Sequence, residues 1–288
     1  MFVFMKAKKS LGQYFLNSPS IIADIVKAGN VEPNDLILEI GPGRGILTEV
    51  LLKIGAKVIA VEKDGALIPE LQKKFVKEIS LKQLNLIHAD ILDIELPHIT
   101  NEPYKIIANI PYYITGQILR TFLESDKQPT RMTLLVQKEV AERIVAKPSP
   151  RSSVAQSAKG GLRAKDGKES LLSLSVKIFG EPKIIRTVGK GAFTPQPNVD
   201  SAVLNIENIP TLSRLNLDKV GGVDTGGFFE LIHLGFRHKR KQLLPNLTSS
   251  FKKEILVKAF EKCGVNLKTR AEDLPLETWL QLCNTITK

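Results

Sequence analysis

Residues 109–112 have the sequence Asn-Ile-Pro-Tyr. Side chains and carbonyls of these types are suited to methyl transfer onto the exocyclic amine of a nucleobase. The lone pair of such an amine is delocalised into the ring, so an enzyme must accept the amine hydrogens while the nitrogen becomes tetrahedral. The side-chain oxygen of Asn109 and the carbonyl of Ile110 can be these acceptors. Pro111 would hold the loop rigid and Tyr112 would stack on the base. An isolated tetrapeptide of this kind is more often a structural turn, so the interpretation needs a cofactor motif.

A glycine-rich turn, EIGPGRG at residues 39–45, supplies that motif. It lies between the apolar run 36–38 and apolar residues at helical spacing, which predicts a strand-to-helix turn where the backbone approaches a ligand. Glu62 ends the next apolar run, 21 residues after Gly41. Its carboxylate can accept both hydroxyls of a ribose. We therefore expect a bound nucleoside against Gly41, Gly43 and Glu62.

The identity of the nucleoside depends on two further features. Asp90, in the sequence HADI after the third apolar run, can accept a hydrogen bond from the adenine amino group of a cofactor. A role for Asp90 as a helix cap or turn residue is about as well supported. NAD is the rival cofactor, but the turn reads GxGxG, with Ile46 where the dinucleotide fingerprint has its third glycine. That spacing, together with the tetrapeptide, favours a methyl donor.

The elements that must position these residues alternate between strands and helices. Helix-like stretches such as 114–123 and 138–146 separate five apolar runs typical of buried strands, at 36–40, 58–61, 84–87, 106–108 and 133–136. This alternation predicts a parallel, doubly wound α/β sheet, which residues 183–188 and 201–207 would complete. Ligands of such sheets bind at the carboxyl ends of the strands, where residues 109–112 lie.

Two domains are expected. Residues 1–209 would form the cofactor-binding domain, and residues 210–288 a small helical domain with helix-like segments at 228–244, 252–263 and 276–283. Within the first domain, residues 148–164 are rich in Ser, Ala, Gly and Pro and carry three basic residues without an acid. Such a composition predicts a mobile loop, for which we favour a solvated insertion over an RNA-binding arm.

The overall charge favours a polyanionic partner, although charge alone supports a solvated basic surface about equally well. Lys and Arg number 41 against 30 Asp and Glu, a formal net charge of +11 with a pI near 9.5. No apolar stretch approaches the roughly 20 residues that cross a bilayer, and the start of the chain lacks a signal-peptide core, so we expect a cytoplasmic protein. Cys263 and Cys283 lack the spacing of a zinc or redox site, so no metal is expected.

Six longer motifs resemble those of one family, the KsgA/RsmA-type ribosomal RNA adenine dimethyltransferases, across nearly the whole chain. They are KKSLGQYFL (8–16), EIGPGRG (39–45), NIPYYI (109–114), LLVQKEVAERI (134–144), FTPQPNVDSAV (193–203) and FRHKRKQLLPNL (236–247). The resemblance implies a class I methyltransferase fold, Rossmann-like, with a seven-stranded sheet, a small C-terminal helical domain and S-adenosylmethionine as methyl donor. It also implies dimethylation of N6 on two adjacent adenines, in the 3′-terminal hairpin of 16S ribosomal RNA, during biogenesis of the small subunit. A monomer acting on the small subunit is expected.

The resemblance also implies site residues. The cofactor contacts of the family fall on Tyr14, Leu16, Gly41, Glu62, Asp90 and Asn109. Tyr14 departs from the usual GQNFL of the family, so its backbone is a more plausible contact than its side chain. Phe193 falls where the family has an aromatic residue that stacks on the target base opposite Tyr112, although it could instead pack the loop. The insertion 148–164 departs as well, because the family has a shorter loop there.

A basic run near the C-terminus, Arg237 to Lys241, follows the apolar helical stretch that begins at residue 228. Phosphate contact is the preferred role for Arg237, Lys239 and Arg240. Part of the run could instead complement the dipole of the helix.

Two other functions stay open. One is that of the related large-subunit RNA adenine methyltransferase associated with macrolide resistance. The motifs GQYFL and VDSAV favour the small-subunit enzymes over this one. The other is that of a non-catalytic RNA-binding assembly factor, against which the intact NIPY and Glu62 argue.

Overall fold

The computed structural model describes residue 8 and residues 12–94, 100–147, 167–209, 219–220, 223–238 and 240–286. The predictions for the insertion 148–164 and for Lys239 lie outside these ranges.

The described residues fall in two compact units. One comprises those within Met1–Glu142 and Phe179–Leu212, and the other those within Arg143–Ile178 and Ser213–Lys288. The sequence placed a domain boundary between residues 209 and 210, close to the second crossing point. The composition of the sequence did not indicate that residues 143–178 belong to the same compact unit as the C-terminal helices.

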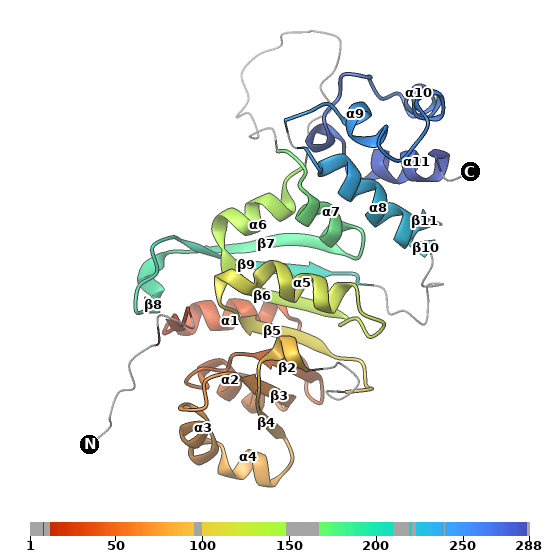
Figure 1. Ribbon diagram of the computed structural model, residues 1–288. Coiled ribbons are helices and arrows are strands. Elements are labelled where there is room, and N and C mark those ends of the chain that lie inside the picture. The colour runs from red at the N-terminus through yellow and green to blue at the C-terminus, as the bar shows by residue number, and fades with distance from the viewer. Residues whose placement is uncertain are drawn as a thin grey trace. The chain divides into compact units, whose positions relative to one another are not determined.

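A seven-stranded sheet, in the order β4-β3-β2-β5-β6-β9-β7, forms the centre of the first unit (Figure 1). The strands are, in that order, β4 (Leu84–His88), β3 (Lys57–Glu62), β2 (Leu36–Ile40), β5 (Lys105–Asn109), β6 (Arg131–Gln137), β9 (Ser201–Glu207) and β7 (Glu181–Val188). The α/β class and the seven strands predicted from the sequence are confirmed.

The sheet is parallel except at β9, which is antiparallel to both β6 and β7. Because β7 and β9 are neighbours joined by a short loop without a crossover helix, they run in opposite directions. The order of the strands reverses between β2 and β5, so the loops after these strands diverge at their carboxyl ends. That divergence is where doubly wound sheets bind ligands.

The described residues also form two short antiparallel ribbons, one in each unit. The first joins β1 (Phe15–Leu16) to β8 (Phe193–Thr194), so the N-terminal segment is tied to the loop between β7 and β9. The second joins β10 (Lys219–Val220) to β11 (Val223–Asp224).

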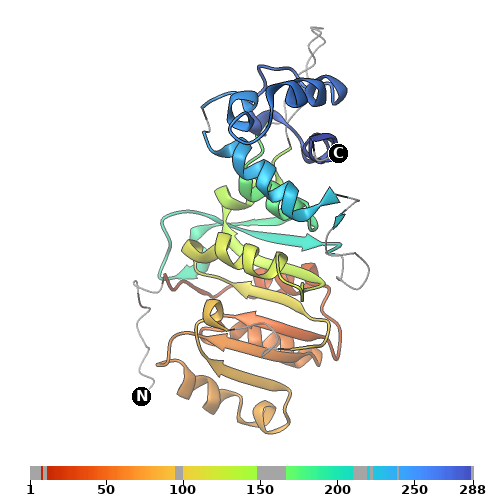
Figure 2. The same ribbon diagram turned by 45° about the vertical axis from the view of Figure 1, so that its right-hand side comes forward.

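Helices pack on both faces of the sheet, with α1 and α5 on opposite sides (Figures 1 and 2). The described helices of the two units taken together are α1 (Pro19–Ala28), α2 (Ile46–Ile54), α3 (Ile68–Lys74), α4 (Val76–Ser80), α5 (Thr115–Leu123), α6 (Lys138–Val145), α7 (Leu171–Lys177), α8 (Thr225–Phe236), α9 (Leu243–Leu247), α10 (Lys253–Lys262) and α11 (Leu276–Ile286), of which α7 to α11 belong to the second unit. Short 3₁₀ turns lie at η2 (Ile91–Asp93), η4 (Tyr112–Ile114), η5 (Lys190–Ala192) and η7 (Ala271–Asp273). This double cover explains the continuous apolar runs in the sequence, since a strand buried on both faces has no polar alternation.

The second unit is helical. Its helix α8 is capped by Asp224, the residue before its first turn, whose carboxylate accepts the backbone N–H groups of Gly226 at 3.1 Å and Gly227 at 2.9 Å. This is a conventional N-cap, which satisfies two donors that the first turn leaves unpaired. Trp279 of α11 is fully buried and stacks on Phe236 of α8 with ring centroids 5.9 Å apart. The aromatic pair thus anchors the first and last helices of the C-terminal segment to each other.

Candidate active site

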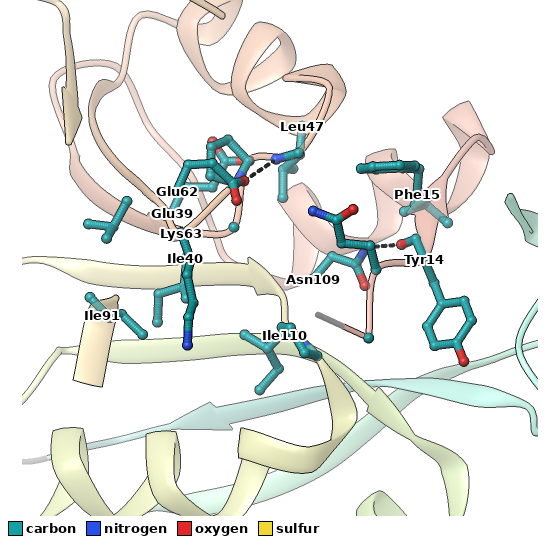
Figure 3. Close-up of a pocket in the computed structure, with 18 of the residues that line it drawn as sticks. Tyr14, Phe15, Glu39, Ile40, Leu47, Glu62, Lys63, Ile91, Asn109 and Ile110 are labelled. Carbon is teal, nitrogen blue, oxygen red and sulfur yellow. Dashed lines mark hydrogen bonds between the residues drawn. The ribbon is translucent and has the colours of Figure 1, made fainter. Parts of the chain in front are cut away.

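A pocket opens at the carboxyl ends of β2, β3 and β5, where the strand order reverses (Figure 3). Its lining comes from Ile22 and from residues within five segments, namely 12–16, 39–47 except Gly45, 61–63, 89–91 and 109–114. Ten of the predicted site residues line it: Tyr14, Leu16, Gly41, Gly43, Glu62, Asp90, Asn109, Ile110, Pro111 and Tyr112. The fold therefore gathers residues from strand ends that lie far apart in the sequence.

The glycine turn brings backbone to the pocket wall. Gly41 and Gly43 have φ angles of +70° and +58°, in the left-handed region that favours glycine. A Cβ at Gly43 would lie 3.1 Å from the ring of Phe15, which packs against the turn. A side chain at this position would therefore push against the N-terminal segment and narrow the pocket.

The carboxylate of Glu62 is held at the end of β3 by two backbone donors. The N–H of Gly43 donates to Oε2 at 3.1 Å, and the N–H of Asp64 donates to Oε1 at 2.8 Å. Burial raises the pKa of Glu62, while these two amides act in the opposite direction. Each oxygen keeps a further lone pair, so the carboxylate can still accept two hydroxyls of a ribose. The glycine cradle and this acceptor fit a nucleoside.

A second carboxyl, that of Glu39 in β2, also lines the pocket. It is 1% exposed, and its Oε2 has no hydrogen-bonding partner among the described residues. Burial raises its pKa to about 8, so the apo protein holds this group largely protonated at neutral pH. Glu39 was not among the residues expected from the sequence, although an acid inside the apolar run 36–40 was the signal that could have found it.

For Asp90 the sequence left open a role in cofactor binding and a role as a helix cap, and the position of the residue in the structure is compatible with both. Its Oδ1 accepts the N–H of Leu92 at 3.1 Å and so caps η2, and the residue also lines the pocket. Its Oδ2 accepts a hydrogen bond from the ammonium group of Lys63. Burial opposes ionisation of Asp90, but Lys63 and the Leu92 amide outweigh it and lower the pKa. A carboxylate is therefore present at the pocket to accept an amino group.

The loop after β5 is joined to the N-terminal segment at two places. Asn109 donates from Nδ2 to the backbone carbonyl of Tyr14 at 2.9 Å (Figure 3). The rings of Tyr14 and Tyr112 stack with centroids 5.6 Å apart and planes at 25°. The hydroxyl of Tyr112 is 2.7 Å from Oγ of Ser201 in β9. The sequence favoured a backbone contact for Tyr14, and its carbonyl is the group that faces Asn109.

Phe193 lies elsewhere. It is not among the residues that line the pocket, and it is 4% exposed within the apolar core beside β1. Its backbone is paired with Leu16 in the β1–β8 ribbon. The structure thus brings Tyr14, rather than Phe193, against Tyr112, and the base-stacking role expected for Phe193 stays a prediction.

The N-terminal segment is tied down by Asp64, a residue that no motif in the sequence had singled out. Its carboxylate accepts the ammonium of Lys8 at 2.6 Å and the side-chain amide of Gln13 at 2.9 Å. Asp64 is 5% exposed and lies two residues beyond Glu62. Burial raises its pKa, but the donors from Lys8 and Gln13 outweigh burial and lower it. Glu62, which lines the pocket, and Asp64, which anchors the N-terminal segment, are therefore only two residues apart at the end of β3.

The predicted phosphate-binding residues lie in the helical unit. Arg237 follows the last residue of α8, and both Arg237 and Arg240 are exposed. Lys239 is outside the described residues. The exposure of the two arginines is compatible with phosphate contact, which stays a prediction.

Two kinds of feature are absent from the described residues. None of the described helices has the length and apolar character required to cross a membrane. Across the described ranges, no group of three or more His, Cys, Asp or Glu side chains could hold a metal ion.

Comparisons with known proteins identify the family to which the chain belongs. Residues 4–288 match the family model described as "Ribosomal RNA adenine dimethylase". The chain is 40% identical over 283 residues to "Ribosomal RNA small subunit methyltransferase A" of Dehalococcoides mccartyi, covering 97% of this chain and 88% of that protein. It is 35% identical over 292 residues to the protein of the same name from Enterococcus faecalis, with 98% and 90% covered.

Two solved structures share the fold. The first is a dimethyladenosine transferase from Plasmodium falciparum, with a TM-score of 0.71 and 25% identity, covering 93% of this chain and 95% of that one. The second is the 23S rRNA methyltransferase ErmE, with a TM-score of 0.70 and 22% identity over 95% of this chain and all of that one. The second likeness shows the fold alone. From its motifs, its fold and these matches, the chain belongs to the ribosomal RNA adenine dimethylase family of S-adenosylmethionine-dependent methyltransferases.

Proposed function

We propose that this protein dimethylates N6 of two adjacent adenines in the 3′-terminal hairpin of small-subunit ribosomal RNA. The observation that carries the proposal is the fixed orientation of Asn109. Because its Nδ2 donates to the carbonyl of Tyr14, the amide cannot rotate without losing that hydrogen bond. No described residue donates to its Oδ1, which remains available to accept a hydrogen from the target amine.

Residues 109–112 would supply the hydrogen-bond acceptors that orient the target amine. Asn109 Oδ1 and the carbonyl of Ile110 would accept the two amine hydrogens and favour a tetrahedral nitrogen. Bound S-adenosylmethionine would supply the methyl group, with a nitrogen–carbon bond formed as the sulfur–carbon bond breaks and S-adenosylhomocysteine leaves. The extra proton then leaves the nitrogen for water. No general base is required before the transfer, because the amine becomes acidic only as it is alkylated.

The other pocket residues would hold the donor. Glu62 would accept the ribose hydroxyls, Asp90 the adenine amino group, and the backbone at Gly41 and Gly43 would lie against the cofactor. Tyr14 and Leu16 would close the pocket from the N-terminal side, since both line it. A donor held in this way would share one cavity with the loop of Asn109.

The choice of small-subunit RNA rests on the relatives. Those with 34–40% identity carry the name of a small-subunit methyltransferase, whereas the large-subunit enzyme ErmE is 22% identical. The formal charge of +11 and the exposed Arg237 and Arg240 support a polyanionic partner. We place the protein in the cytoplasm, acting as a monomer on the small subunit without a metal.

The test is to incubate the protein with labelled S-adenosylmethionine and with unmethylated small or large ribosomal subunits, and then to map the modified nucleosides. We expect N6-dimethyladenosine at two adjacent positions near the 3′ end of small-subunit RNA. Label in large-subunit RNA alone would favour the resistance-type enzyme. Tight binding to small subunits without any label would favour an assembly factor.

A further inference from the structure

The hydroxyl of Tyr112 is hydrogen-bonded to a side chain of the sheet. It lies 2.7 Å from Oγ of Ser201, the first residue of β9, across 89 residues of sequence. Ser201 is fully buried and is not among the residues that line the pocket. Because Tyr112 is expected to stack on the target base, this contact joins a ring proposed to meet the substrate to a residue outside the pocket.

The backbone of Ser201 is held on several sides. Strand β9 pairs with β6 on one side and with β7 on the other, and Ser201 takes part in both ladders. The preceding residue, Asp200, is held as well, since its Oδ1 accepts the N–H of Lys190 at 3.0 Å and its carbonyl accepts the N–H of Lys138 at 3.0 Å. A hydroxyl on such a backbone can shift little, so it fixes the position of the group that it contacts.

The backbone end of the Tyr112 side chain is held by its turn. Pro111, which precedes it, has a restricted φ, and the carbonyl of Pro111 accepts the N–H of Ile114 at 3.2 Å. The carbonyl of Tyr112 accepts the hydroxyl of Thr115 at 3.1 Å. A tyrosine side chain turns about two bonds, so a fixed backbone and a hydrogen-bonded hydroxyl together set the orientation of its ring.

We propose that Ser201 is a positioning residue for the methyl transfer, which orients the ring of Tyr112 for the target base through the hydrogen bond between the two hydroxyls. The inference rests on the proposed function and deepens it. Strands β5, β6 and β9 are neighbours in the sheet (Figure 1), so the loop after β5 has to span only β6 to reach Ser201. The sheet itself thereby sets the plane on which the base would stack.

The size of the effect follows from the preorganisation of the ring. Without the hydrogen bond to Ser201, the Tyr112 ring would sample further orientations and would have to be ordered each time a base enters. Ordering a side chain in this way costs about 0.5 to 1.5 kcal/mol, which corresponds to roughly 2- to 13-fold in rate at about 1.36 kcal/mol per tenfold. Phosphate contacts elsewhere would hold the RNA, so the loss should fall on kcat rather than on KM.

The experiment compares Ser201→Ala, which removes the hydroxyl, with Ser201→Thr, which keeps it and suits a strand. Steady-state methylation of unmethylated small subunits is measured at saturating S-adenosylmethionine. We expect kcat of Ser201→Ala to fall by roughly 2- to 13-fold with little change in KM, and Ser201→Thr to stay close to wild type. If the added methyl group makes Ser201→Thr unstable, Ser201→Cys replaces it, and its weaker donor should give a kcat between those of Ala and wild type.

Thr133→Val is the matched control, because it removes another fully buried hydroxyl whose partner lies on β9. Oγ1 of Thr133 is 2.9 Å from the side-chain amide of Asn205, and neither residue lines the pocket. This variant should lose thermal stability but keep the wild-type kcat at a temperature where all the variants are folded. Equal losses of kcat in Thr133→Val and Ser201→Ala would assign Ser201 to the stability of the sheet and overturn the proposal.

A double-mutant cycle then tests whether Ser201 acts through Tyr112. Tyr112→Phe keeps the ring and removes its hydroxyl, so its kcat should fall by about as much as that of Ser201→Ala, and the double variant should be no slower than either single one. Additive losses would overturn the proposal, as would an unchanged kcat in Ser201→Ala. Failure of the proposed function is a separate result, since the wild-type protein would then leave small subunits unmethylated.

Discussion

The side-chain nitrogen of Asn109 donates to the backbone carbonyl of Tyr14 at 2.9 Å, across 95 residues of sequence. This hydrogen bond joins the loop proposed to orient the target amine to the segment that closes the cofactor pocket. It also determines which atom of the amide is left for the substrate, because an asparagine that donates here keeps its oxygen free. Substitutions at Asn109 and at the carboxylates around it test this arrangement.

Replacement of Asn109 by Ala should reduce turnover far more than RNA affinity. Loss of one positioned polar group at a reacting centre typically lowers the rate by about a hundredfold or more. N6-dimethyladenosine per small subunit, measured by nucleoside mass spectrometry with both substrates saturating, is the readout. Asn85→Ala, on the exposed face of β4, is the matched control and should behave as wild type. Near-normal dimethylation by Asn109→Ala would leave residues 109–112 as a structural turn.

Glu62→Ala should raise the dissociation constant of S-adenosylmethionine by roughly tenfold or more, since hydrogen bonds to a charged group contribute about 1.5 to 3 kcal/mol. The change also leaves the N–H groups of Gly43 and Asp64 without their acceptor. Glu62→Gln keeps an acceptor of similar size, so its affinity should lie between those of Ala and wild type. Calorimetry that shows equal affinity for folded Glu62→Ala would remove this residue from the site.

Asp64→Asn should loosen the N-terminal segment, because it removes the charge that pairs with Lys8. We expect lower kcat/KM for the small subunit and a loss of thermal stability at neutral pH. Asp35→Asn is the matched control, as it breaks a comparable ion pair with Lys105 at the opposite ends of the strands. An effect of equal size in both variants would assign the loss to general destabilisation.

The pH dependence of the Asp64 contact has a definite sign. Its pKa is lowered in the folded protein, so the stabilisation is present above the unfolded value of about 3.9 and is lost as pH falls through the folded value. Thermal unfolding of wild type and Asp64→Asn should therefore converge in acid. If the melting temperatures of the two proteins differ by the same amount from about pH 3 to about pH 7, this linkage is contradicted.

Glu39→Gln should remove a pH-dependent loss of stability. Burial raises the pKa of Glu39 from 4.5 to about 8, so its favourable contribution is complete below 4.5 and is lost as pH rises through about 8. The stability of Glu39→Gln relative to wild type should therefore increase across that window. Thermal unfolding of the cofactor-free proteins measures it, and a constant difference would show that Glu39 is ionised throughout.

Replacement of Arg237, Lys239 and Arg240 together by Gln should weaken RNA binding with little dependence on sequence. If all three contact phosphates, the slope of log affinity against log salt should fall by roughly 2 to 3, at about 0.7 to 0.9 per contact. A matched triple replacement at exposed lysines of the first unit, Lys57, Lys77 and Lys82, should leave the slope unchanged. Equal slopes for both triples would place the three residues on a solvated face.

The sequence by itself determined the elements and most of the pocket. The apolar run before the glycine turn, the acid at the end of β3 and the tetrapeptide after β5 are local patterns, and each was enough to place its residue at a strand end. Parallel strands then bring those ends to one edge of the sheet without further information. For this reason Gly41, Glu62, Asp90 and Asn109 could be predicted as neighbours from the order of residues alone.

Only the tertiary structure decided how the N-terminal segment sits on the site. The stacking of Tyr14 on Tyr112, the anchoring by Asp64 and the burial of Phe193 join segments separated by tens of residues to well over a hundred. No local period encodes such contacts, because they depend on which side chains fill the space left when the sheet and its helices have packed. The grouping of residues 143–178 with the C-terminal helices has the same origin, since it follows from packing rather than from order along the chain.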